Sequence, residues 1–324
     1  LFASEKAGET NLDAELSVYE CTIENGKWVR MDKEEGKAIL LLSSVQQTYE
    51  FYREVLNRKG FNGQNGTMLL VSDRHADEEL SGSDNACALT LPNLSIMLFN
   101  SKAMVGNIAL PAHEFTHAVE QTISTMEYKG ESGCLMEGYS DLMGQLVLAH
   151  TSGQDPDWKL YGRDMSTPQQ GEQVYYYGDL TPDTEVHRGS TVVSHCEYQI
   201  WQSWRESGMD VPTCAENMAR LLYRCLFLLP SRATLTDWRW AMEQVAIQMI
   251  EDEDLTSQHF DQMISAFQES GIPSMMEQEQ VQTWMAALTE IASMPLKNGT
   301  DKLTEEQMEL AACSLFPMAA AELS

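Results

Sequence analysis

His113, Glu114 and His117 place two imidazoles four positions apart, with a carboxylate directly after the first. On an α-helix, residues four apart share one face, so both histidines can point at one ion. Such a group suits zinc-dependent hydrolysis, in which the imidazoles bind Zn²⁺ and the carboxylate takes a proton from water. Two surface histidines on an amphipathic helix would give the same pattern, so the motif alone suggests a zinc site without deciding it.

A second segment supplies the third protein ligand that a catalytic zinc needs. Glu137 lies twenty positions after His117, and a turn containing Gly130 and Gly133 can lay its helix beside the first. Asp141 is one helical turn further on the same face, where a carboxylate can accept the N–H of a ligand histidine and fix its tautomer. Two solvent-exposed acids on a helix would give the same pattern as Glu137 and Asp141. Beside the two histidines, the ligand interpretation is favoured.

These segments resemble one known family. The stretches HEFTHAVE (113–120), YKGESG (128–133) and MEGYSD (136–141) are similar to those of the thermolysin family of zinc metallopeptidases, also called neutral proteases or bacillolysins. The family pattern is HExxH, then nineteen residues, then a glutamate, as here. Related zinc aminopeptidases typically have one residue fewer in this gap. The resemblance covers roughly residues 40–272 and therefore most of the chain.

The resemblance implies an α+β fold, that of a thermolysin-like two-domain metallopeptidase. An N-terminal mixed α/β domain, rich in strands, is expected over residues 1–108. The zinc-site helix and an all-helical C-terminal domain are expected over residues 109–272, with the HExxH helix between the two domains on the floor of a cleft. Residues 273–324 match nothing in the family pattern and are expected to form a helical extension of unknown role.

Hydrophobic periodicity and turn residues predict the elements that position these side chains. Strands are expected at Ser17–Cys21, Lys27–Met31, Gly66–Ser72 and Ser95–Asn100. Helices are expected at Ser43–Lys59, Cys134–His150, Thr191–Glu206, Ala215–Leu229, Asp237–Ile250 and Ser257–Ser270, besides the HExxH helix, which continues to Met126. Thr236 is the expected N-cap of one helix, and Thr304–Gln307 fits a capping box in the extension.

The resemblance implies a role for each residue of the zinc site. His113, His117 and Glu137 match the zinc ligands, and Glu114 matches the general base. Asp141 matches the carboxylate that holds the first ligand histidine. A hydrolytic mechanism follows, in which zinc-activated water attacks the peptide bond and Glu114 accepts its proton.

The resemblance also implies groups that contact the reacting peptide. Tyr128 and His187 match the hydrogen-bond donors to the oxyanion of the tetrahedral intermediate, whose negative charge needs preorganised donors. Arg163 matches the arginine that binds a backbone carbonyl of the substrate. The acid that orients His187 is either Asp183 or Glu185, and the sequence does not choose between them.

Substrate-binding positions can be assigned in the same way. Asn85 and Ala86 match a pair on the family's edge strand, where asparagine can bond an extended peptide backbone; a turn before a strand is the alternative. Met104, Leu110 and Leu160 match the pocket for the residue after the cleaved bond. All three are apolar, so a bulky apolar residue is expected there, with broad specificity because apolar pockets discriminate weakly.

The sequence departs from the family pattern at two places that affect bound ions. Family members usually hold a double calcium site through carboxylates. Three of the corresponding positions are not acidic here and read Ala109, Leu148 and Lys159; only Asp157 keeps an acid. Ca²⁺ needs several oxygen ligands, so the double calcium site is predicted to be absent. The asparagine that usually precedes the third zinc ligand is Met136 here.

The composition excludes several other classes of protein. The 324 residues carry a formal net charge of −28, which disfavours binding to nucleic acid and to anionic lipid. No apolar run is long enough to span a bilayer. The seven cysteines contain no CxxC pair, so a cysteine zinc site is not expected. The chain begins at Leu1 without a visible leader, so it is expected to be a mature or excised chain.

The expected function is that of a secreted, extracellular zinc endopeptidase acting on peptides or proteins. One alternative is an inactive thermolysin-like fold that serves as a binding module, although the base and all three ligands are present. A zinc aminopeptidase is the other alternative, and it would need an acid for the free amine, for which no motif is visible.

Overall fold

The chain divides into two units, residues 1–272 and residues 273–324. The described part of the first unit consists of a mixed β-sheet and a set of packed helices. The computed structural model describes residues 16–24, 27–30, 36–73, 86–99, 107–160, 162–167 and 173–275. Within these ranges no helix is long and apolar enough to cross a membrane. Asn85, Met104 and the expected capping box at Thr304–Gln307 lie outside the described residues.

The sheet has five strands in the order β2-β1-β3-β5-β4. They are β1 (Leu16–Glu24), β2 (Lys27–Arg30), β3 (Thr67–Asp73), β4 (Ala86–Leu91) and β5 (Leu94–Phe99). Strands β1, β3 and β5 are parallel, whereas β2 and β4 run antiparallel to their neighbours at the two edges. Periodicity did not predict β4, although the family resemblance placed Ala86 on an edge strand; the structure pairs β4 with β5 from Ala86↔Phe99 to Leu91↔Leu94.

One face of this sheet packs into the main core. Met68 and Leu70 of β3 and Met97 and Phe99 of β5 are buried there. Helix α1 (Gly36–Leu56) begins seven residues before the expected Ser43 and contacts both β3 and the first helix of the site. Alternate side chains on the other face of β3 and β5 form a separate, smaller cluster around Val71.

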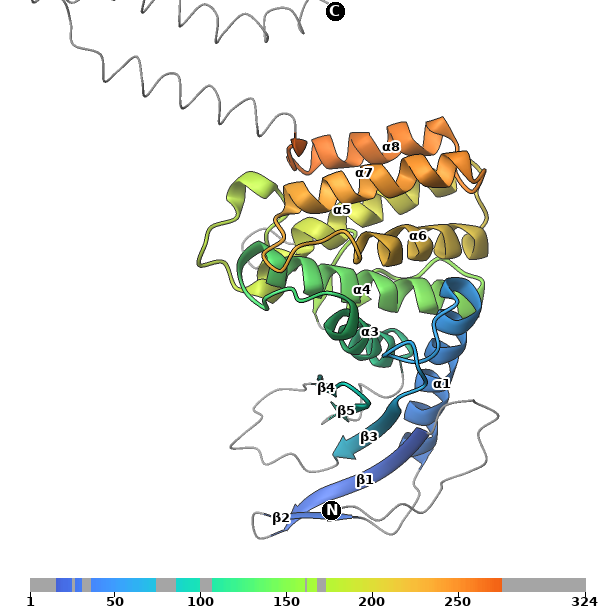
Figure 1. The fold of residues 1–324 in the computed structure, drawn as a ribbon, viewed down its shortest axis with the longest axis vertical. Coiled ribbons are helices and arrows are strands. Elements are labelled where there is room, and N and C mark those ends of the chain that lie inside the picture. Colours follow the sequence, from blue (N-terminus) through green and yellow to red (C-terminus); the bar gives the residue numbers. More distant parts are fainter. Residues whose placement is uncertain are drawn as a thin grey trace, which may run out of the picture. The chain divides into compact units, whose positions relative to one another are not determined.

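The helical part is built around α4 (Gly130–Ser152), which packs most extensively against α3 (Ala109–Ile123), α5 (Val186–Glu206) and α6 (Val211–Cys225) and also contacts α1. In Figure 1, α3 lies between the sheet and the remaining helices, which include α7 (Leu235–Glu251) and α8 (Ser257–Glu269). The short strands β6 (Lys159–Leu160) and β7 (Arg163–Asp164) and a 3₁₀ turn, η1 (Tyr177–Asp179), follow α4.

Two glycines of α4 let neighbouring helices approach its backbone closely. A Cβ at Gly144 would lie 2.3 Å from the carbonyl oxygen of Ala109, at the start of α3. A Cβ at Gly138 would lie 2.6 Å from Cβ of Val193 on α5. Such separations exclude any larger side chain, so these glycines fix how near α3 and α5 lie to α4.

Helix starts follow the local capping residues. The expected N-cap Thr236 is wrong: Thr234 caps α7, forming a capping box with Asp237, and Thr236 lies buried inside the helix. Asp210 caps α6 through the backbone N–H of Thr213, which starts this helix four residues before the expected Ala215. Glu185 similarly caps α5. A capping side chain offers the acceptor that a first-turn N–H lacks, and so sets these boundaries.

Five of the seven cysteines lie among the described side chains, and none of the five forms a disulfide. Cys134, Cys196, Cys214 and Cys225 are buried in the helical part, as expected of small apolar residues. Cys87 differs, because it is exposed on β4.

Candidate metal centre and cleft

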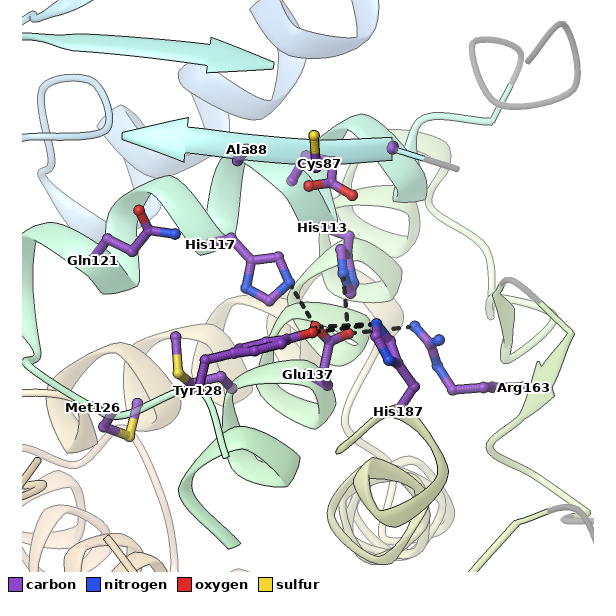
Figure 2. Close-up of a pocket in the computed structure, with 13 residues that line it drawn as sticks. Cys87, Ala88, His113, His117, Gln121, Met126, Tyr128, Glu137, Arg163 and His187 are labelled. Carbon is purple, nitrogen blue, oxygen red and sulfur yellow. Dashed lines mark hydrogen bonds and ion pairs between the residues drawn. The ribbon is translucent and has the colours of Figure 1, made fainter. Parts of the chain in front are cut away.

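A cavity of about 590 Å³ lies between the edge strand β4 and the helices that carry the candidate metal ligands. Figure 2 shows β4 above the pocket, α3 behind it, and Tyr128, Glu137 and His187 below. The lining side chains come from segments far apart in the chain: β4, α3, the connection after α3, α4, β7 and the start of α5. A site of this kind exists only when the sheet and the helices pack together.

His113, His117 and Glu137 converge on one point of this cavity. All three are buried, and one potential ligand atom from each lies within 4.8 Å of the others. Nε2 of His113 is 3.6 Å from one carboxylate oxygen of Glu137, and Nε2 of His117 is 3.3 Å from the other. The two histidines share one face of α3, as their spacing predicts, and α4 presents Glu137 to that face.

Carboxylates fix the orientation of both imidazoles. Nδ1 of His113 lies 2.9 Å from Asp141 Oδ1. Nδ1 of His117 lies 3.0 Å from Glu120 Oε2 and 3.1 Å from the hydroxyl of Ser140. With Nδ1 of each ring held by an acceptor, Nε2 is the nitrogen turned toward Glu137.

The donors fit Zn²⁺. Two imidazole nitrogens and one carboxylate oxygen are a typical protein set for a catalytic zinc, which keeps one position open. Burial alone would raise the pKa of Glu137, but the hydrogen bond and charge of His117 and the charge of His113 lower it and so favour the carboxylate form. Its Oε2 is buried without a hydrogen-bond partner among the described residues. A cation held here would satisfy that oxygen.

Glu114 faces the cavity beside the metal cluster without belonging to it. It is buried, and burial raises its pKa, although the neighbouring charges of His113 and His117 oppose the rise. A carboxylate with a raised pKa is better matched to accepting a proton near neutral pH.

Tyr128 and His187 meet at the mouth of the cavity (Figure 2). The hydroxyl of Tyr128 donates a hydrogen bond to Oε1 of Glu137 and lies 3.3 Å from Nε2 of His187. Nδ1 of His187 is 2.6 Å from Glu185 Oε1. Of the two acids between which the sequence could not choose, the structure therefore places Glu185, and not Asp183, on this histidine.

Arg163 is turned toward the floor of the site. Its Nε and Nη2 each donate to an oxygen of Asp141 at 2.6 Å, and Nη2 lies 3.8 Å from Glu137. Burial alone would raise the pKa of Asp141, but the charge of Arg163 and the contact with His113 lower it. Asp141 thus lies between Arg163 and His113 as a buried carboxylate with a partner on each side.

The structure brings only part of the expected substrate site to the cavity. Ala86 lines it from β4, together with Cys87 and Ala88, which the sequence did not single out. Leu110 and Leu160 are buried in the main core and do not line this cavity. Leu110 is three residues before His113 on α3, and Leu160 pairs with Arg163 across β6 and β7.

Sequence reasoning gave no site role to Glu120, which contacts His117, or to three residues that line the cavity: Gln121, Met126 and Met136. For Glu120 a signal was present, since it lies three positions after His117 and so shares its face on a helix. Nothing in the pattern around Met126 indicates that the connection after α3 turns back to the cavity.

Comparisons with known proteins find similarity to thermolysin-like metallopeptidases. Residues 124–272 match the protein family described as thermolysin metallopeptidase, alpha-helical domain. Bacillolysin of Bacillus caldolyticus is 25% identical over 249 residues, which are 69% of this chain and 43% of that protein. Bacillolysin of Bacillus cereus is 31% identical over 194 residues, which are 55% of this chain and 33% of that protein. The chain therefore spans less than half the length of these relatives.

One solved structure has a similar fold. The precursor of protealysin, a metalloproteinase from Serratia proteamaculans, superimposes with a TM-score of 0.64 over 83% of this chain and 91% of that chain. The sequence identity is 17%, so the likeness concerns the fold alone.

Proposed function

We propose that this chain is a thermolysin-like metallopeptidase and acts as a zinc-dependent endopeptidase. One observation carries the proposal: two imidazoles and a carboxylate converge in a cavity, and an acceptor holds each imidazole so that Nε2 faces the shared point. Surface histidines on an amphipathic helix would be exposed and would not have buried carboxylates behind them.

In the proposed reaction, His113, His117 and Glu137 hold Zn²⁺. When bound, Zn²⁺ would act as a Lewis acid that polarises the carbonyl of the peptide bond and lowers the pKa of a bound water. Glu114 accepts a proton from the attacking water and passes it to the leaving amine. Its position on the cavity wall and its raised pKa support this role.

The remaining residues at the mouth of the cavity act on the substrate. Tyr128 and His187 are proposed to donate hydrogen bonds to the oxyanion, because Tyr Oη and His Nε2 lie side by side next to Glu137. Arg163 is proposed to reach a backbone carbonyl of the substrate while its Nε and Nη2 remain on Asp141, since a guanidinium has five donor hydrogens.

The substrate is proposed to be an extended peptide. Strand β4 is at the edge of the sheet and lines the cavity, so a peptide can pair with its backbone. Ala86, the first residue of this strand, and Asn85, which precedes it in the sequence, are the proposed contact positions. A bulky apolar residue after the cleaved bond is proposed from the resemblance alone, since Leu110 and Leu160 do not line the cavity. Action outside the cell belongs to the same proposal and rests on the resemblance.

An internally quenched, end-blocked peptide with Leu or Phe at its centre tests this function. We expect cleavage before the apolar residue, and loss of cleavage both with a zinc chelator and in Glu114→Ala. End blocking matters because an aminopeptidase requires a free amine. A folded, zinc-loaded protein that leaves every such peptide intact would favour the alternative of a binding module.

A further inference from the structure

Glu120 is a buried acid on α3 that the proposed mechanism does not use. It is one helical turn beyond His117, and its side chain is 1% exposed. Its Oε2 is 3.0 Å from Nδ1 of His117. Its Oε1 is buried without a hydrogen-bond partner among the described residues. The contact with His117 is thus the principal interaction that the structure gives this carboxylate.

The two candidate ligand histidines are supported in the same way from different helices. Asp141, on α4, is 2.9 Å from Nδ1 of His113. Glu120, on α3 itself, is 3.0 Å from Nδ1 of His117. Each imidazole therefore has its own buried carboxylate on the nitrogen that faces away from Glu137. A carboxylate in this position fixes the tautomer and makes the other nitrogen a stronger donor to a metal.

Met136, which stands before Glu137 on α4, offers no strong acceptor for Nδ1 of His117. Met136 lies on α4 one helical turn before Ser140, whose hydroxyl is 3.1 Å from Nδ1 of His117. Position 136 therefore shares the face of α4 that is turned to this nitrogen. A thioether is only a weak acceptor, whereas an asparagine there would offer a carbonyl oxygen.

We propose that Glu120 is a positioning residue of the metal site. It holds Nδ1 of His117, for which Met136 offers no strong acceptor. The Glu120 side chain accepts a hydrogen bond from Nδ1–H of His117 and so keeps Nε2 aimed at the shared point. The motif of this chain is thus HExxHxxE, with the last acid acting through the second histidine. The inference rests on the proposed zinc site, since it concerns how tightly that site holds its ion.

Zinc affinity, measured by competition with a chromophoric chelator, tests the inference without relying on peptide cleavage. We expect Glu120→Ala to bind zinc about 10 to 100 times more weakly than the original chain, the usual effect of removing such a partner. Glu120→Gln keeps an acceptor for Nδ1 but not the charge, so its loss should be smaller. The control is Glu197→Gln, which removes another fully buried carboxyl, on α5, that contacts no ligand in the structure.

Two further measurements separate positioning from a general effect on folding. Met136→Asn in the Glu120→Ala background should restore most of the lost affinity, because it returns an acceptor to the face of α4 that carries Ser140. Co²⁺ bound to Glu120→Ala should show an altered visible spectrum, since one imidazole is no longer held.

The outcomes separate this inference from the proposed function. Zinc binding by Glu120→Ala or Glu120→Gln equal to that of the original chain would overturn the inference, as would an equal loss in Glu197→Gln. An original chain that binds no zinc at all would instead contradict the proposed function. If Glu120→Ala does not fold, the ordering of Glu120→Gln against Glu197→Gln decides.

Discussion

Arg163 and Asp141 form a bidentate ion pair beside the candidate metal ligands, with Nε and Nη2 of the arginine each 2.6 Å from a different carboxylate oxygen. Asp141 is fully buried and also contacts His113. The arginine that resembles a substrate-binding residue therefore also neutralises the acid that holds a candidate zinc ligand. Bidentate geometry of this kind depends on the planar guanidinium, which lysine does not reproduce.

Removing Arg163 should consequently damage the fold and the metal site as well as substrate binding. Arg163→Ala leaves a buried carboxylate without its main partner, which typically costs about 3–5 kcal/mol of unfolding free energy. Arg163→Lys should recover only part of this loss. Urea unfolding together with zinc titration measures both effects. A variant that raises KM alone, with unchanged stability and zinc affinity, would mean that Arg163 serves only the substrate.

The contact of Gly144 with α3 gives a prediction on the scaffold. Gly144→Ala would place a Cβ 2.3 Å from the Ala109 carbonyl oxygen, which is backbone and cannot rotate away. We expect α3 to shift and the unfolding free energy to fall by about 1–3 kcal/mol. Gly153→Ala at the end of the same helix is the control, because its Cβ meets open space and only its positive φ of 67° opposes alanine.

The two glycine variants should also differ at the metal site. A shift of α3 carries His113 and His117 with it, so Gly144→Ala should weaken zinc binding, whereas Gly153→Ala should not. Equal zinc affinity in both variants would show that α3 is positioned by other contacts.

Asp164 gives a prediction on acid stability. Burial alone would raise its pKa, but the hydroxyl and N–H of Ser166, the N–H of Thr167 and the ammonium of Lys159 lower it from 3.8 to about 2. A depressed folded-state pKa stabilises the fold above the unfolded value, and this contribution disappears as the pH falls from about 4 to 2. After solvent screening we expect about 1 kcal/mol.

Unfolding free energies between pH 6 and pH 2 check this sign. Asp164→Asn should be less stable than the original chain at pH 6, and the two should converge toward pH 2. A difference that stays constant across this range would mean that the charge of Asp164 does not contribute.

Selective chelators test the two metal predictions made from the sequence, namely that zinc binds and that the double calcium site is absent. Because the positions of the double calcium site read Ala109, Leu148 and Lys159 beside Asp157, we expect a calcium-selective chelator to leave Tm unchanged. A zinc-selective chelator should lower Tm, since loss of a ligand that binds only the folded state removes its stabilisation. Calcium-dependent Tm in zinc-loaded protein would overturn the predicted absence.

The sequence predicted the α+β fold and the thermolysin-like family, both confirmed by the comparisons, because HExxH and the distant glutamate have a fixed spacing on two helices. It also placed most helices of residues 130–272 to within a few residues. Its periodicity missed β4, whose stretch of alanine and cysteine carries little strand signal, although the family resemblance placed Ala86 on an edge strand. It misplaced the cap of α7, because Thr234 and Thr236 are both plausible caps in the sequence and only the capping box separates them.

The contacts of side chains explain what the sequence could not provide at the site. The choice of Glu185 over Asp183 depends on how the chain enters α5, where Glu185 also accepts the N–H of Arg188. Leu110 is buried in the main core and does not line the cavity, which depends on how α3 packs in the fold. Such details follow from packing between elements, which local patterns do not encode.

Glu185 and Asp183 provide a matched pair for testing the proposed oxyanion donor. Glu185 Oε1 lies 2.6 Å from Nδ1 of His187 and keeps Nε2 directed toward Tyr128 and Glu137. In Glu185→Gln the charged partner is lost, so we expect kcat to fall by about tenfold or more with little change in KM, because an oxyanion donor acts mainly in the transition state. His187→Ala should cost about 10²–10³ in kcat. Asp183→Asn, two residues earlier and without a contact to His187 in the structure, should retain full kcat. If Asp183→Asn loses as much activity as Glu185→Gln, the loop before α5 and not the Glu185 contact controls His187.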